Sequence, residues 1–136
     1  MPAGLEVRVG IDIAAVDDVR RSVERFGDRY LNHVFTAHEL SCCGREPTAR
    51  AAALAARFAA KEATIKVLRP ADLRPPWTSI EVRRQPGGWC ELRLSRAAAR
   101  MAREQQMTGF ALSITHEADV AAAVVVAYRN ADVHDG

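Results

Sequence analysis

The sequence predicts an α+β fold in which a long central helix packs on a largely antiparallel sheet. Strand patterns occur near both ends of the chain, one long helical run lies in the middle, and a hairpin signal follows it. Because strands and helices are segregated rather than strictly alternating, antiparallel pairing is favoured. The 136 residues suffice for one domain, expected over residues 1–129, and are too few for two.

Residues 7–13 predict a strand, because apolar side chains alternate with others at a period of two. The apolar side chains share one face. Arg8, Gly10 and Asp12 share the other, and Gly10 is expected to leave open space beside Asp12. A carboxylate in such a strand must be paired, capped or metal-bound, so Asp12 is a candidate site residue. A turn or cap at the strand end is the alternative.

Helices are predicted to follow this strand. Apolar residues recur at helical spacing over residues 16–29. Thr36 and Glu39 fit a capping box at the start of a short helix. The longest helical run covers residues 49–68 and ends before Pro70.

The second half of the chain predicts a hairpin, a helix and two further strands. The hairpin is indicated by a Pro-Gly-Gly turn between two strand patterns, and Ser95 is the expected helix cap. The expected elements are strands at 79–85 and 89–94, a helix at 95–106, strands at 109–116 and 120–128, and a flexible tail at 130–136.

Composition excludes several classes of protein. A net charge of +2 is too small for a strong nucleic-acid field. Three cysteines without C-x-x-C spacing argue against a disulfide framework and a zinc site. The most apolar stretch, residues 120–128, has about half the length of a membrane helix, and no signal peptide is visible. We therefore expect a cytoplasmic protein without nucleic-acid or membrane partners.

The long helix carries the most informative charged residues. Only two of the 19 basic residues are lysines, and both lie here, as Lys61 and Lys66. Lys61 projects into the apolar stripe, while Glu62 and Lys66 lie along one edge of it and Arg57 along the other. Since the chain uses arginine as its cation everywhere else, these two positions favour a function that needs a compact ammonium group, such as phosphate binding. The alternative is a snorkelling Lys61 and a surface pair of Glu62 with Lys66.

Two further groups complete the candidates. His116 ends a strand beside Ser113, although a solvated or capping histidine is the alternative there. Arg20, Arg21 and Arg25 give the first helix a basic surface that suits an acidic partner helix. A solvated face with internal ion pairs is the alternative.

Three segments resemble the holo-acyl-carrier-protein synthases, the small single-domain 4′-phosphopantetheinyl transferases. They are V-G-I-D-I at 9–13, R-F-A-A-K-E-A at 57–63 and S-I-T-H at 113–116. The resemblance implies transfer of the phosphopantetheine arm of coenzyme A to a serine of an apo acyl carrier protein, with release of 3′,5′-ADP. It also implies a homotrimer with each active site at a subunit interface. A non-catalytic module that binds coenzyme A or a carrier protein is the alternative.

The resemblance implies catalytic roles for three residues. Asp12 and Glu62 would hold Mg²⁺ against the pyrophosphate, which agrees with the preference of Mg²⁺ for carboxylate oxygens. Lys66 would neutralise the phosphates. A base must take the proton of the serine, and we assign this to Glu62, directly or through a metal-bound water.

The same resemblance places Arg57, Lys61, Ser113 and His116, together with Lys66, in the coenzyme site. The chain also departs from the family. Leu68-Arg69-Pro70-Ala71-Asp72 stands where many relatives carry a glycine-rich turn.

A second departure concerns the first helix. Asp17 and Asp18 stand where relatives tend to carry basic residues. We therefore expect weak docking to a strongly acidic carrier unless Arg20, Arg21 and Arg25 bind the carrier instead. A specialised carrier is the resulting hypothesis.

Overall fold

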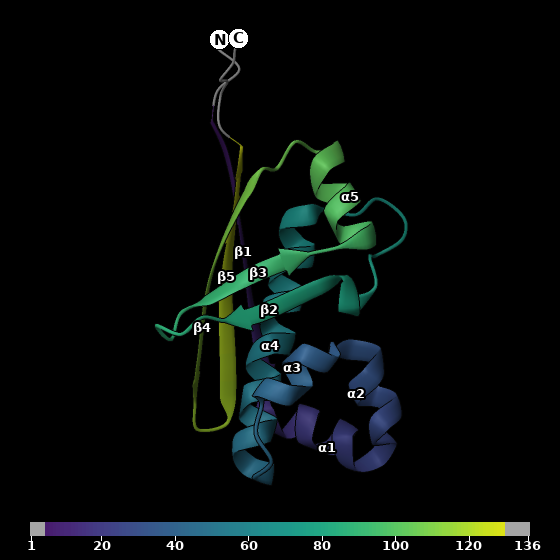
Figure 1. The fold of residues 1–136 in the computed structure, drawn as a ribbon, viewed down its shortest axis with the longest axis vertical. Coiled ribbons are helices and arrows are strands. Elements are labelled where there is room, and N and C mark those ends of the chain that lie inside the picture. Colours follow the sequence, from purple (N-terminus) through teal and green to yellow (C-terminus); the bar gives the residue numbers. More distant parts are fainter. Residues whose placement is uncertain (1–4, 130–136) are drawn as a thin grey trace.

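The computed structural model describes residues 5–129, and it confirms the predicted α+β fold. In chain order the elements are β1 (Glu6–Ala15), α1 (Val16–Phe26), α2 (Asp28–Val34), α3 (Ala37–Cys42), α4 (Pro47–Leu68), η1 (Trp77–Ser79), β2 (Ile80–Arg84), β3 (Cys90–Leu94), α5 (Arg96–Glu104), β4 (Gly109–Glu117) and β5 (Val120–Arg129). Strands β1, β5 and β4 form an antiparallel sheet in that order, and β2 and β3 form a separate hairpin. The helices lie to one side of the three-stranded sheet (Figure 1).

Small residues let α4 pack closely against the three-stranded sheet. Ala55, Ala59 and Ala63 of α4 are fully buried. A Cβ atom on Gly10 of β1 would collide with the carbonyl oxygen of Ala63. The expectation of open space at Gly10 is therefore wrong, because the backbone of α4 fills it. This close approach places Asp12, on the same face of β1, beside the helix.

The apolar face of β1 points away from α4. Val9 and Ile13 are each 65% exposed, and both pair directly with residues of β5. Residues that pair directly across strands share a face, so the apolar surface continues onto β5. We call this surface the outer sheet face; on β1 and β5 it consists of Val7, Val9, Ile11, Ile13, Ala122, Val124 and Val126.

Some predicted boundaries change. The helix expected over 16–29 is divided, because Gly27 adopts a positive φ of 59° and separates α1 from α2. Ser95 occupies the N-cap of α5 without a side-chain capping bond, and the helix ends at Glu104. The tail predicted at 130–136 lies outside the described residues. Within residues 5–129, no helix has the length and apolar character needed to cross a bilayer.

Candidate functional site

Asp12 and Lys66 meet where β1 passes the C-terminal half of α4. Lys66 Nζ lies 3.2 Å from Asp12 Oδ1 and donates a hydrogen bond of 2.7 Å to the carbonyl oxygen of Ile11. Glu62 lies one helical turn before Lys66 on the same edge of α4. The packing of β1 on α4 therefore brings the two candidate acids to one edge of the helix, although they are 50 positions apart in the chain.

Glu62 pairs with a cation that sequence reasoning did not identify. Its Oε1 atom lies 3.4 Å from Arg74 Nη1, on the segment that follows α4. The predicted alternative of a Glu62–Lys66 pair is not formed, since Lys66 pairs with Asp12.

The oxygen atoms at this edge suit a hard divalent cation. Mg²⁺ is typically held by one or two protein carboxylates, and its remaining positions are filled by water and phosphate oxygens. Asp12 and Glu62 supply two carboxylates, and within residues 5–129 no group of three or more His, Cys, Asp or Glu side chains gathers as a metal site. The donor set therefore fits Mg²⁺, with Asp12 and Glu62 as the residues that would hold it.

A cavity of about 310 Å³ is lined by residues of the opposite edge of α4. Its basic side chains are Arg57 of α4, Arg84 of β2 and His116 of β4. Arg57 is buried, and its Nε atom has no hydrogen-bond partner among the described residues, while its Nη1 donates to the Ala53 carbonyl at 3.1 Å. Two guanidinium groups with free donors suit a phosphate. Sequence reasoning did not identify Arg84, because nothing in the local sequence distinguishes it from the other arginines of the chain.

Ser113 does not line this cavity. It pairs directly with Val124 of the outer sheet face, whereas His116, three positions later, belongs to the opposite face of β4. Within one chain the structure therefore brings His116 and Arg57 together but not Ser113.

Lys61 lies inside the fold, so the described residues give no support to its predicted role in the coenzyme site. Its side chain is fully buried, and Nζ lies 2.8 Å from Glu39 Oε1. Nζ also donates to the carbonyl oxygens of Trp77 and Ile80. Burial lowers the pKa of Lys61, and the Glu39 carboxylate opposes that effect. Every ammonium proton has a partner inside the fold, and no snorkelling occurs.

Glu39 connects this lysine to two other elements. The capping box predicted for Thr36 and Glu39 is confirmed. Glu39 also accepts a hydrogen bond of 2.8 Å from the backbone N–H of Val82. The sequence indicated that Lys61 needed a partner but could not say which acid supplies it.

Two of the three candidate docking arginines are already paired within α1. Arg20 lies 3.0 Å from Asp17, and Arg21 lies 2.7 Å from Asp18. These are the two acids that were expected to weaken docking. Arg20 and Arg21 therefore present ion pairs to a partner rather than free positive charges.

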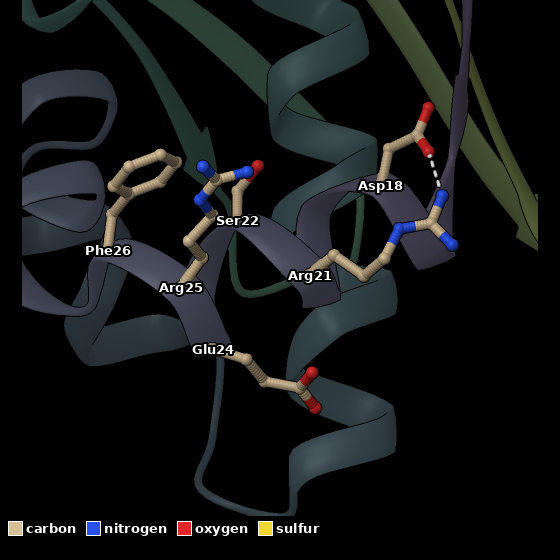
Figure 2. Close-up of a pocket in the computed structure, with 6 residues that line it drawn as sticks. All are labelled: Asp18, Arg21, Ser22, Glu24, Arg25 and Phe26. Atoms are coloured by element: carbon tan, nitrogen blue, oxygen red, sulfur yellow. Dashed lines mark hydrogen bonds and ion pairs between the residues drawn. The ribbon is translucent and has the colours of Figure 1, made fainter.

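Arg25 differs from its neighbours on α1. Its guanidinium lies over the ring of Phe26, 5.2 Å from the centroid, and Arg29 lies 5.4 Å from the same centroid. Figure 2 shows Arg25 directed toward Phe26 and away from the Asp18–Arg21 pair. Among the described residues Arg25 forms no ion pair. It is therefore the available cation of the predicted docking group.

Comparison with known proteins gives a consistent result. The sequence profile of the 4′-phosphopantetheinyl transferase superfamily matches residues 8–125. The chain is 40% identical to a holo-[acyl-carrier-protein] synthase of Desulforudis audaxviator (88% of this chain, 90% of the relative) and 42% identical to one of Myxococcus xanthus (91% and 96%). It also resembles the Helicobacter pylori holo-[acyl-carrier-protein] synthase solved in complex with coenzyme A, with a TM-score of 0.74 at 25% identity (88% and 99%).

Proposed function

Because this chain belongs to the holo-[acyl-carrier-protein] synthases of the 4′-phosphopantetheinyl transferase superfamily, we propose that it transfers 4′-phosphopantetheine from coenzyme A to a serine of an apo acyl carrier protein, with Mg²⁺ and release of 3′,5′-ADP. The observation that supports this proposal is the ion pair of Asp12 with Lys66 at the contact of β1 with α4, one helical turn from Glu62. A non-catalytic binding module has no need of both acids.

The transfer breaks a diphosphate with an alcohol nucleophile. The serine Oγ forms a bond to the phosphorus that bears pantetheine, the bridging P–O bond breaks, and 3′,5′-ADP leaves with the electron pair. Glu62 takes the hydroxyl proton, directly or through water. Lys66 stabilises negative charge on the phosphates, and its bonds to Asp12 and Ile11 hold its position. Mg²⁺, when bound by Asp12 and Glu62, supplies Lewis-acid chemistry.

We further propose that Arg57, Arg84 and His116 bind the nucleotide part of coenzyme A. The unpartnered Nε of Arg57 supports an anionic ligand in their cavity. The cavity and the carboxylates occupy opposite edges of α4, so one chain separates the two halves of the site.

Association of several copies of the chain would bring the cavity of one copy to the carboxylates of another. The outer sheet face is apolar and exposed within one chain, which is typical of a protein–protein interface. We propose that copies of the chain, as a homotrimer, associate through this face and that each active site combines the acids of one copy with the cavity of another.

The function is tested by incubating the full chain with coenzyme A, Mg²⁺ and an apo carrier, followed by mass spectrometry of the carrier. We expect a mass gain of one phosphopantetheine, which EDTA and Glu62→Gln abolish, while Asp72→Asn, an exposed acid of the segment after α4, leaves it unchanged. Wild-type protein that binds coenzyme A without modifying any carrier would instead favour the binding module.

A further inference from the structure

The segment between α4 and η1, residues 69–76, places an arginine on a proposed metal ligand. Arg74 Nη1 lies 3.4 Å from Glu62 Oε1, and the arginine side chain is 63% exposed. Three of the eight residues are prolines, which restricts the backbone of the segment. The segment therefore presents a solvent-accessible guanidinium at Glu62.

The end of this segment is fixed to α4 itself. Buried Lys61, the residue before Glu62, donates a hydrogen bond of 3.0 Å to the carbonyl of Trp77. The Trp77 ring packs on Phe58, with centroids 5.3 Å apart. Both anchors belong to the helix that carries Glu62, so the end of the segment that bears Arg74 is fixed to that helix.

A guanidinium and a divalent cation compete for the same carboxylate oxygens. Even when the cation takes the other oxygen of the group, it neutralises the carboxylate charge that attracts the guanidinium, so metal binding at Glu62 weakens the bond of Oε1 to Arg74. A released Arg74 then stands beside the metal site with a planar fork that matches phosphate oxygens.

We propose that Arg74 is a charge-exchange residue, which pairs with Glu62 until a divalent cation takes this carboxylate and then binds the diphosphate of coenzyme A. The inference rests on the proposed function. It assigns a further diphosphate-binding residue to the segment 69–76, which contains no glycine. Arg74 weakens metal binding in the absence of substrate and strengthens the binding of coenzyme A in the presence of metal.

The test compares Arg74→Gln and Arg74→Lys with wild type and with the control Arg69→Gln, an exposed arginine of the same segment. Mn²⁺ binding is measured by electron paramagnetic resonance without coenzyme A, and KM for coenzyme A is measured by carrier mass gain. Since exposed ion pairs are weak, we expect Arg74→Gln to tighten Mn²⁺ binding by about two- to fivefold. It should raise KM for coenzyme A by about fivefold, and Arg74→Lys should partly restore this KM.

Tighter Mn²⁺ binding together with a higher KM for coenzyme A supports charge exchange, because a merely structural role of Arg74 would weaken the binding of both ligands. Unchanged Mn²⁺ affinity, weaker Mn²⁺ binding, or an unchanged KM in Arg74→Gln would overturn the inference. A wild-type protein that binds Mn²⁺ but modifies no carrier would count against the proposed function, while the Mn²⁺ comparison would still decide whether Arg74 competes for Glu62.

Discussion

Asp12 and His116 lie on the two edge strands of the same sheet, with β5 between them. Asp12 pairs with Ala123 of β5, and His116 pairs with Ala121 on the other side of that strand. Adjacent strands are about 4.8 Å apart, so about 10 Å of sheet separates the two edges. Because α4 packs on the face of the sheet that carries both residues, a site that uses both is expected to draw them from different copies of the chain.

Complementation between two inactive variants tests this arrangement. Asp12→Ala and His116→Ala should each lose nearly all transfer activity when expressed alone. Co-expression places an intact half-site of one chain against that of another, and random mixing should restore activity at about a quarter of the sites. The measurement is carrier mass gain by the purified mixture. Activity that stays at the level of the single variants would show that the halves do not combine across copies.

A charge on the outer sheet face should prevent association. Val9→Glu places a carboxylate among apolar side chains of β1 and β5, where burial against another copy would be costly. Light scattering after size-exclusion chromatography should give the mass of a single chain. Leu73→Glu, at a side chain that is more exposed than Val9 but lies outside the sheet, should retain the wild-type mass. A wild-type chain that is itself monomeric would contradict the oligomer.

Docking of the carrier should depend on Arg25 more than on Arg21. Arg21 is neutralised by Asp18, whereas Arg25 is free for an acidic partner. We expect Arg25→Ala to lower kcat/KM for the carrier by about three- to tenfold and Arg21→Ala to lower it by less than about twofold. KM for coenzyme A should stay constant in both. Equal effects of the two variants would refute this assignment.

The acids of α1 should set the preference for carriers. Asp18→Asn frees Arg21, so we expect it to raise kcat/KM for a strongly acidic carrier by about twofold, an effect that fades in high salt. Steady-state rates on carriers of differing acidity provide the measurement. A wild-type enzyme that already prefers the most acidic carrier would contradict the hypothesis of a specialised carrier.

Local patterns predicted the elements of this fold because their causes are local. The capping box of Thr36 and Glu39 lies within one helical turn, and the alternation of β1 is a property of one strand. Alternation shows which residues share a face but not which face is buried, and here the polar face of β1 meets α4. The pairing of Glu39 with Lys61 depends on packing between distant segments, which a single sequence does not encode locally.

The buried pair of Lys61 and Glu39 should matter for folding rather than for coenzyme binding. Lys61→Met leaves the Glu39 carboxylate buried without its partner, and we expect a loss of about 3–5 kcal/mol in the free energy of unfolding. Urea denaturation provides the measurement. Lys61→Met combined with Glu39→Gln should recover part of the loss, because no buried charge remains. A double variant less stable than the single one would contradict this account.

Alkaline stability should depend on Tyr30, which packs edge-on against Phe35. Burial raises the pKa of Tyr30 to about 12, whereas an unfolded tyrosine titrates near about 10. A raised pKa means that the folded state favours the neutral phenol, so this stability is present below pH 10 and is lost as the pH rises toward 12. Since Tyr30 is partly exposed, we expect the wild type to lose about 1 kcal/mol relative to Tyr30→Phe between about pH 8 and pH 11. Parallel urea titrations of the two proteins give this difference, and a constant difference across that range would show that Tyr30 ionises alike in both states.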